Sequence, residues 1–310
     1  MFRKQDAFLL LTSYATMALG IFLPELSAPL RAVPMGCVMF LLLLSFLAVD
    51  LAQVLRCALA APLDTVRLLA VKCLLLPVAA FALYHTFWPE YQLSALLVAG
   101  ASTAVLAPFF ARLFRADVGL TAAGVILSSL LLPFTLPPLV AGLAGGKLQV
   151  GVAAMAQMLA VMIFVPALAG RACVRWLPQP ADWLLKRSYP LSLTAVALTN
   201  LGVFSRYSHY FLQNPALALQ AMVAGTLLVA LVMLLGPLLF RGTTPEFRAT
   251  ALVCTLFPNY ILILAFSGQF FGPAEATFAA TYSVPFFLQV LVLRKLIGVS
   301  GGGTVKTPAE

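Results

Sequence analysis

The chain has 310 residues, of which 62% are hydrophobic and only 9% are charged. Soluble domains are typically about 45–50% apolar and about 25% charged, so this composition excludes a water-soluble domain and indicates a membrane protein. A formal net charge of +9 would suggest nucleic-acid binding in a soluble protein, but here the positions of the basic residues account for it. The five cysteines are odd in number and widely spaced, which argues against both a disulfide framework and a zinc site.

Charged, proline-rich and glycine-rich segments divide the chain into ten apolar runs, at residues 7–24, 33–53, 65–87, 93–114, 118–144, 149–171, 187–205, 215–240, 247–268 and 272–296. A membrane span needs roughly 20 apolar residues, and these runs are too long for barrel strands. Because unpaired backbone groups are costly in lipid, each run is interpreted as a helix. The sequence therefore predicts an all-α polytopic membrane protein with about ten transmembrane helices, followed by a disordered cytoplasmic tail at residues 300–310.

The basic residues predict the orientation of these helices. With the N-terminus in the cytoplasm, alternating loops place fifteen Lys and Arg residues inside and three outside, namely Arg31, Lys147 and Arg206. This asymmetry is the positive-inside rule, so the net charge needs no nucleic-acid partner. We expect a multi-pass protein of the cell (inner) membrane with both termini in the cytoplasm.

Ten helices with both ends on one side divide into two halves of five helices with opposite orientation. We place these inverted repeats at residues 1–145 and 146–299. Such repeats are typical of secondary transporters, whose binding sites lie at discontinuous helices. Two runs are interrupted in corresponding positions, the fourth by Gly100-Ala101-Ser102-Thr103 and Ala107-Pro108, and the ninth by Phe257-Pro258-Asn259.

Pro108 and Pro258 lie 150 residues apart, which is close to half the chain. Each proline lacks an amide donor and frees the carbonyl four residues before it, here Ala104 and Cys254. Free carbonyls suit a cation, whereas the half-helix N-termini after the breaks suit an anion. The alternative interpretation is that both prolines are ordinary kinks, since membrane helices tolerate proline.

Several motifs resemble one transporter family. They are Gly100-Ala101-Ser102-Thr103, Ala111-Arg112, Arg115-Ala116-Asp117-Val118-Gly119-Leu120-Thr121, and Ser128-Ser129 ahead of Pro133. Together they resemble the fourth and fifth helices of the bile acid:sodium symporter family. Residues 248–259 are similar to its ninth helix, and residues 72–77 to its third.

This resemblance implies a ten-helix fold of two inverted repeats, with a panel domain (helices 1, 2, 6 and 7) and a core domain (helices 3–5 and 8–10). In the family, helices 4 and 9 unwind and cross, and the core moves against the panel to alternate access. The resemblance also implies sodium as the coupling ion. The family's sodium-binding Ser-Asn pair is replaced by Ala107-Pro108, its glutamate on helix 9 by Cys254, and its glutamine there by Pro258. Thr121 and Asn259 alone keep side-chain oxygens among these positions, and sodium prefers hard oxygen ligands. This set of residues should bind sodium poorly.

Lys72 occupies the position of a glutamine that helps to hold sodium in the family. One interpretation is that its ammonium acts as an internal counterion, within about 4 Å of the Cys254 carbonyl and the break in helix 4. Such a buried lysine is also a candidate proton carrier. The alternative is that Lys72, five residues beyond Arg67, extends its head to the cytoplasmic interface.

The candidate site residues carry alternatives of their own. Asn259 either binds substrate or caps a helix, and Gln289 either faces the cavity or bonds a neighbouring helix. Small hydroxyl residues also let helices pack closely. The candidates for substrate binding are Ser102, Thr103, Pro108, Pro258, Asn259 and Gln289, and those for coupling or an internal cation are Lys72, Thr121, Ser128 and Cys254.

These observations predict a secondary active transporter for a small or amphipathic organic anion, embedded in the lipid bilayer and without an obligate protein partner. The alternatives are a sensory or regulatory membrane protein with the same fold, or a channel. No metal site or enzyme is expected, because the two histidines, His85 and His209, lie far apart and no nucleophile has a base near it in the sequence. Sodium is the one cofactor that the resemblance suggests.

Overall fold

The computed structural model describes residues 4–144 and 151–296, and nearly all of them are helical. The predicted boundary between the repeats, at residues 145 and 146, and the predicted tail at 300–310 lie outside the described residues. No strand occurs in the described part of the chain, where the β-structure consists of an isolated bridge. The prediction of an all-α fold is confirmed.

The first half of the chain forms nine α-helices and three short helical turns within the described residues. In chain order they are α1 (Lys4–Phe22), α2 (Pro24–Ser27), η1 (Ala28–Ala32), α3 (Pro34–Leu47), α4 (Leu51–Ala60), α5 (Pro62–Ala70), η2 (Val71–Leu75), α6 (Leu76–Phe87), η3 (Pro89–Tyr91), α7 (Gln92–Gly100), α8 (Ala107–Leu113) and α9 (Val118–Ala144). The turn η2 is π-helical, and it joins α5 and α6 into one continuous segment.

The second half, as far as it is described, consists of α10 (Val152–Trp176), α11 (Pro178–Lys186), α12 (Ser188–Arg206), α13 (Ser208–Gln213), α14 (Pro215–Leu239), α15 (Pro245–Leu256), α16 (Tyr260–Phe270), α17 (Pro273–Thr281) and α18 (Ser283–Leu296). Prolines stand in the first turn of many of these helices, for example α11, α14, α15 and α17. Amides in the first turn have no hydrogen-bond acceptor within the helix, so the amide that proline lacks is not missed there. Proline therefore favours the start of a helix at these positions.

Several helices are long and apolar enough to cross a membrane. Among the described residues four helices meet this description, namely Pro62–Phe87, Val118–Ala144, Val152–Trp176 and Pro215–Leu239. Pro24–Ala32 and Pro34–Leu47, bent by 61° at a short break, form a further candidate. The predicted runs at 93–114 and 247–268 are each divided into two helices, and each of these helices is shorter than a membrane span.

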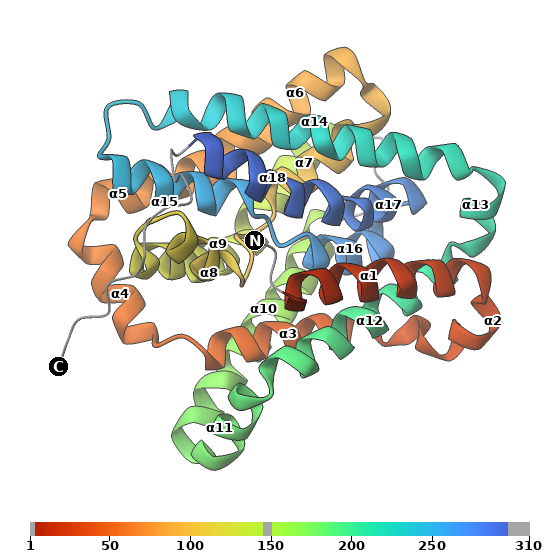
Figure 1. Ribbon diagram of the computed structural model, residues 1–310, viewed down its shortest axis with the longest axis horizontal. Coiled ribbons are helices and arrows are strands. Elements are labelled where there is room, and N and C mark those ends of the chain that lie inside the picture. The colour runs from red at the N-terminus through yellow and green to blue at the C-terminus, as the bar shows by residue number, and fades with distance from the viewer. Residues whose placement is uncertain (1–3, 145–150, 297–310) are drawn as a thin grey trace.

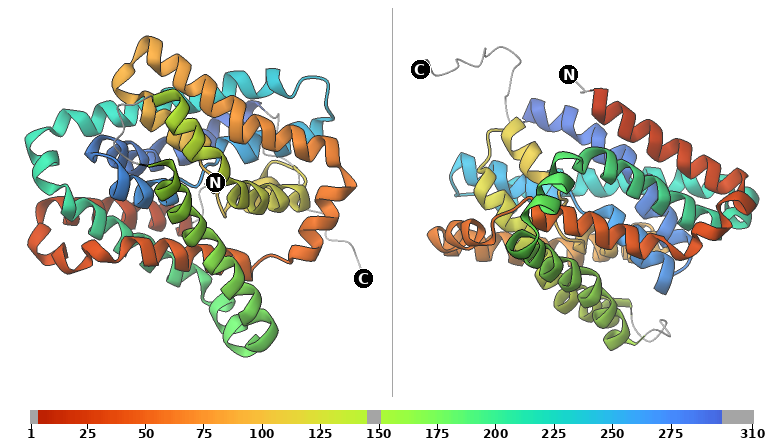
Figure 2. Two further views of the ribbon diagram at one scale, coloured as in Figure 1. Left: turned by 180° about the vertical axis from the view of Figure 1, so that it is seen from behind. Right: turned by 90° about the horizontal axis from the view of Figure 1, so that it is seen from below.

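The helices form two groups according to their contacts. In the first group, α1 packs on α12, and α3 packs on both α10 and α12. In the second, η2 packs on α5 and α6, and α6 packs on α7. This group also contains the pairs α8 and α9, and α16 and α17, together with α14, which packs on α15, α17 and α18. Contacts of α9 with α10, and of α16 with α3 and α12, join the groups. Figure 1 and Figure 2 show α1, α3 and α12 together along one side of the molecule, with α14 on the opposite side.

Candidate functional site

Two interrupted helices meet at the centre of the second group. The break between α7 and α8 covers residues 101–106, and the break between α15 and α16 covers residues 257–259. Thr103 and Pro258 form an antiparallel bridge, in which the Ala104 amide donates to the Phe257 carbonyl and the Asn259 amide donates to the Ser102 carbonyl, both at 2.7 Å. We call residues 102–104 and 257–259 the crossing. Each break supplies the hydrogen bonds that the other has lost from its helix.

A third helix supports the crossing through hydroxyl groups. The Thr103 amide donates to Ser128 Oγ of α9 at 2.9 Å, and the Ser128 hydroxyl donates to the Val125 carbonyl at 3.3 Å. Thr103 Oγ1 donates to the Cys254 carbonyl at 3.0 Å. The structure therefore brings three sequence-predicted residues, Thr103, Ser128 and Cys254, into one hydrogen-bonded group.

The two prolines differ in what they do. Pro258 lies in the crossing itself, whereas Pro108 lies in the first turn of α8, where it begins a helix. The prediction of a free Ala104 carbonyl is wrong, because the chain before Pro108 is not helical and this oxygen accepts the Ala107 amide at 2.9 Å. The Cys254 carbonyl has lost its helical donor as predicted, but the Thr103 hydroxyl replaces that donor.

The half-helices after the breaks offer fewer free amides than the sequence led us to expect. Helix α8 starts at Ala107 rather than directly after Thr103, and the amides of Phe109 and Phe110 both donate to the Leu106 carbonyl. At the start of α16, the Leu262 amide donates to Asn259 Oδ1 at 3.3 Å. Helix capping by Asn259 is therefore confirmed as one role of this side chain.

Lys72 lies in the π-helical turn η2 and is buried, with 1% of its surface exposed. Its Nζ donates to the Ala99 carbonyl at 3.1 Å. The interpretation that Lys72 reaches the interface is wrong, because its side chain is buried and directed at the C-terminal end of α7 instead. The predicted hydrogen bond from Lys72 to the Cys254 carbonyl is also wrong, because the ammonium donates to Ala99, and the Cys254 carbonyl accepts from Thr103.

Ala99 belongs to the last turn of α7, where the carbonyls lack helical donors and the helix dipole is negative. A lysine ammonium is therefore well placed there. The groups that interact electrostatically with Lys72 are the thiols of Cys73 and Cys254, and no carboxylate is among them in the described part of the chain. The positive charge is held by backbone dipoles rather than by an acid.

Cys254 and Thr121 complete the surroundings of Lys72. The Cys254 side chain faces α9 closely, since a Cβ placed on Gly124 would lie 2.9 Å from Cys254 Sγ. The side chains of Thr103 and Thr121 lie beside this thiol. Thr121 Oγ1 also donates to the Asp117 carbonyl at 2.6 Å. The four residues predicted for coupling or an internal cation thus lie around one junction of η2, α7, α9 and α15.

Gln289 and Ser102 each leave a polar atom without a partner. Gln289 on α18 donates its Nε2 to the Leu256 carbonyl at 2.7 Å, so the predicted bond between helices is present. Among the described residues, its Oε1 and the Ser102 Oγ are buried without a hydrogen-bond partner. Buried polar atoms normally have partners, so these two atoms are exceptions within the site.

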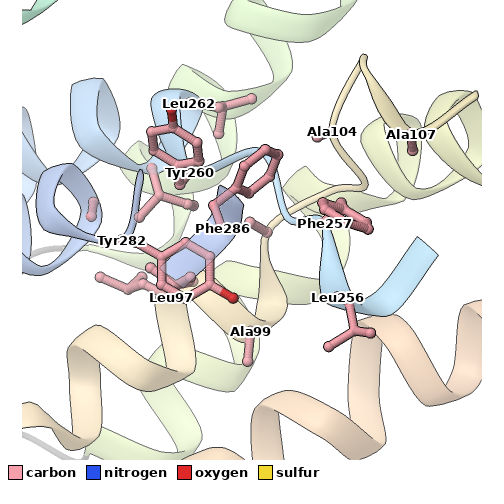
Figure 3. Packing of buried hydrophobic residues seen from close by; sticks show 14 of the residues in the cluster. Leu97, Ala99, Ala104, Ala107, Leu256, Phe257, Tyr260, Leu262, Tyr282 and Phe286 are labelled. Atoms are coloured by element: carbon pink, nitrogen blue, oxygen red, sulfur yellow. The ribbon is translucent and has the colours of Figure 1, made fainter. Parts of the chain in front are cut away.

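An aromatic cluster covers the crossing. Phe110 and Phe257 stack with ring centroids 4.0 Å apart, and Phe286 meets Phe257 edge-on at 5.2 Å. Tyr260 and Tyr282 extend the cluster, as Figure 3 shows. These rings exclude water from the unwound backbone and so strengthen its hydrogen bonds. These rings could not be identified from the sequence, because aromatic residues in apolar runs carry no distinguishing signal.

A pocket lies beside the crossing, between α3 of the first group and the break and α9 of the second. Its volume is about 170 Å³, and it is lined by Leu42, Ser45, Phe46, Ala48, Val49, Val105, Pro108, Val125, Ile126 and Ser129. The Ser45 and Ser129 hydroxyls donate to carbonyls of their own helices. Of the predicted site residues, Pro108 lines this pocket. The contribution of α3 was not predicted, because residues 38–49 are apolar apart from Ser45 and nothing in the sequence distinguishes one face of the helix from another.

The model of the sodium bile acid symporter family matches residues 30–214, which is more than half of the chain. The chain belongs to this family. The family match and the long apolar helices together indicate an integral membrane protein of a transporter family. No curated protein matches the chain. The match includes Lys72, α7, α8 and α9, whereas α15 to α18 lie beyond it.

Proposed function

We propose that this member of the sodium bile acid symporter family is a secondary active transporter that moves a small or amphipathic organic anion by alternating access. The observation that carries the proposal is the pair of hydrogen bonds between the breaks, Ala104 to Phe257 and Asn259 to Ser102. Broken helices inside a membrane protein are tolerated where they are buried or line a cavity, and transporters place binding sites there. The proposal includes multi-pass insertion in the cell membrane with both termini in the cytoplasm.

The proposed architecture is ten spans in two inverted five-helix repeats. The first group of helices (α1, α3, α10 and α12) corresponds to the panel domain, and the second group (α5 to α9 and α14 to α18) corresponds to the core domain. The positions of the breaks support this, because α7 and α8 make up the fourth predicted run, and α15 and α16 the ninth. In this proposal the core moves against the panel along the contacts of α16 with α3 and α12.

The pocket between α3 and the break is the proposed substrate site. Its lining is mostly carbon, with the hydroxyls of Ser45 and Ser129 as polar groups. Such a surface fits the hydrocarbon body of an amphipathic molecule. The family's name contains bile acid, an amphipathic anion, and we carry this substrate class to the chain as a proposal.

The proposed coupling differs from the family's name, which contains sodium. We propose that Lys72 supplies the positive charge that a sodium ion supplies elsewhere in the family. Its ammonium is fully enclosed and bonded to the last turn of α7, and no carboxylate interacts with it among the described residues. A charge inside a membrane protein is costly and usually has a partner or a task. No covalent chemistry is part of this proposal.

Uptake of a labelled bile acid into proteoliposomes tests the function. Uptake is measured with an imposed sodium gradient, with a proton gradient and with no gradient. We expect saturable accumulation that the sodium gradient does not increase. Sodium-driven accumulation would refute the role of Lys72 but keep the transporter. Non-saturable flux would favour a channel, and saturable binding without accumulation under any gradient would favour a sensory or regulatory protein.

A further inference from the structure

Helix α11 (Pro178–Lys186) stands apart from the rest of the bundle. Figure 1 and the left-hand view of Figure 2 show it projecting at the far end of α10 and α12. Its contacts are chiefly with α10, α12 and α3. Neither the pocket nor the crossing includes any residue of α11, so the transport cycle proposed above assigns it no role.

The surface of α11 and its flanks is apolar and aromatic. Trp176 is 72% exposed, Leu177 53% and Trp183 49%. Helix α10, which leads into α11, is apolar and long enough to span a membrane and is largely exposed along its length. Because α10 ends at Trp176, these side chains lie where a span ends, and tryptophan is enriched at the boundary between hydrocarbon and headgroups.

The same surface is strongly basic. Residues 171–187 contain four cationic side chains, Arg171, Arg175, Lys186 and Arg187, all of them exposed, and one acidic residue, Asp182. Arg171 and Arg175 are four residues apart on α10 and therefore share one of its faces. The remaining two cations come at the end of α11.

One of these cations is held in place by an aromatic ring. The Arg187 guanidinium lies over the Trp183 ring, with its central carbon 4.8 Å from the ring centroid. Stacking on one face orders the guanidinium while its hydrogen-bond donors stay free at the edges, and these donors match the geometry of a phosphate group. Arg187 is therefore suited to bind the phosphate of a lipid headgroup while Trp183 lies at the adjoining edge of the hydrocarbon layer.

We propose that α11, with the adjoining ends of α10 and α12, is a docking surface for anionic phospholipid headgroups. The tryptophans and Leu177 enter the interfacial layer, and the four cations bind the phosphates and the negative surface charge of the leaflet. Exposed apolar side chains beside clustered Lys and Arg are the pattern of interfacial helices that bind anionic lipid. Because α11 contacts helices of the first group, bound lipid anchors that group while the second group moves.

Tryptophan fluorescence tests the proposal on the full-length protein. The chain has three tryptophans, so Trp88→Phe leaves only Trp176 and Trp183 as reporters. This variant is reconstituted in phosphatidylcholine bilayers that contain about 30 mol % of either dibrominated phosphatidylglycerol or dibrominated phosphatidylcholine. We expect the anionic lipid to associate at least about threefold more strongly with these tryptophans at low salt. Raising the salt from about 0.05 M to about 0.5 M should remove this preference without any change in the protein.

A charge variant and a matched control give the second arm. Arg171→Gln/Arg175→Gln/Lys186→Gln/Arg187→Gln, made in the Trp88→Phe background, should lose the preference but keep its quenching by brominated phosphatidylcholine. The control neutralises four exposed arginines elsewhere, Arg56, Arg112, Arg115 and Arg241, and should keep the preference. Equal quenching by the two lipids at low salt, in the protein that keeps all four cations, would overturn the proposal. A preference for the anionic lipid that survives both high salt and the four substitutions would also overturn it.

Discussion

Lys72 and Ala99, 27 residues apart in the chain, are joined by a buried hydrogen bond of 3.1 Å between the ammonium and the carbonyl oxygen. The bond ties the π-helical turn η2 to the last turn of α7, directly before the chain unwinds into the crossing. The cation therefore lies at the negative end of a helix dipole, where its charge is stabilised. It also links the third predicted span to the fourth.

Substitutions at Lys72 should show whether transport depends on the charge of this side chain or on its volume. Lys72→Met keeps an unbranched apolar stem but leaves the Ala99 carbonyl without its charged donor. Hydrogen bonds to charged groups contribute about 1.5–3 kcal/mol, so we expect uptake to fall by at least about tenfold. Lys72→Gln restores a side-chain oxygen and should abolish uptake or make it respond to sodium. Unchanged, sodium-blind uptake by both variants would contradict the coupling proposal.

The Thr103 hydroxyl should stabilise the crossing measurably. Thr103→Val has nearly the same shape but leaves the Cys254 carbonyl without the donor seen at 3.0 Å. A buried acceptor that loses its partner costs about 1–3 kcal/mol, so the free energy of unfolding should fall by that amount. Thermal or denaturant unfolding in detergent measures the change. Thr103→Ser, which keeps the hydroxyl, should lose much less.

Thr86 provides the control for this substitution, because it is exposed and its hydroxyl bonds a carbonyl of its own helix. Thr86→Val should leave stability almost unchanged. If Thr103→Val were as mild as Thr86→Val, the bond to Cys254 would have no energetic role in holding the crossing together.

The packing between α9 and α15 leaves no room for a side chain at Gly124. A Cβ there would lie 2.9 Å from Cys254 Sγ and 3.4 Å from Leu68 Cδ2. We expect Gly124→Ala to be less stable than the matched Gly142→Ala by about 1–3 kcal/mol, because overpacking strains a buried contact. Gly142 lies on the same helix, is exposed, and its added Cβ would meet nothing within 4 Å.

A double-mutant cycle identifies the cause of that loss. Cys254→Ala removes the sulfur, so Gly124→Ala should cost less in the Cys254→Ala protein than in the wild type. Equal costs in both backgrounds would show that Cys254 is not the obstructing group, since independent sites give additive changes.

Much of the candidate site could be predicted because its signals are local. Small residues at 100–103 and proline at 258 interrupt apolar runs, and the structure breaks both helices there. The partners of the freed groups could not be predicted, since they depend on how separate helices pack. Thr103 rather than Lys72 reaches the Cys254 carbonyl, because Lys72 is directed at Ala99. Pro108 reads as a kink in an apolar run, but the chain before it is already unwound, so it begins α8 instead.

The pocket could not be predicted from the sequence either, but for a different reason. Its wall on α3 includes Leu42 and Phe46, and apolar residues of this kind look alike in sequence whether they face lipid, a neighbouring helix or a cavity. The apolar run predicted this helix but not which of its faces meets the crossing. That face became apparent only from the contacts between the two groups of helices.

Filling the pocket should block transport without disturbing the fold. Ala48 lines the pocket and is exposed within the structure, so the ring in Ala48→Phe enters the open volume of about 170 Å³ rather than the packed core. A phenylalanine ring would occupy part of this space, so we expect uptake of a labelled bile acid to fall at least about tenfold, with stability changed by no more than about 0.5 kcal/mol. Ala82→Phe on the exposed face of α6 adds the same ring away from the pocket and should leave uptake unchanged. If both variants transport like the wild type, the substrate does not pass between α3 and the chain at Val105 and Pro108, and the substrate site must lie elsewhere.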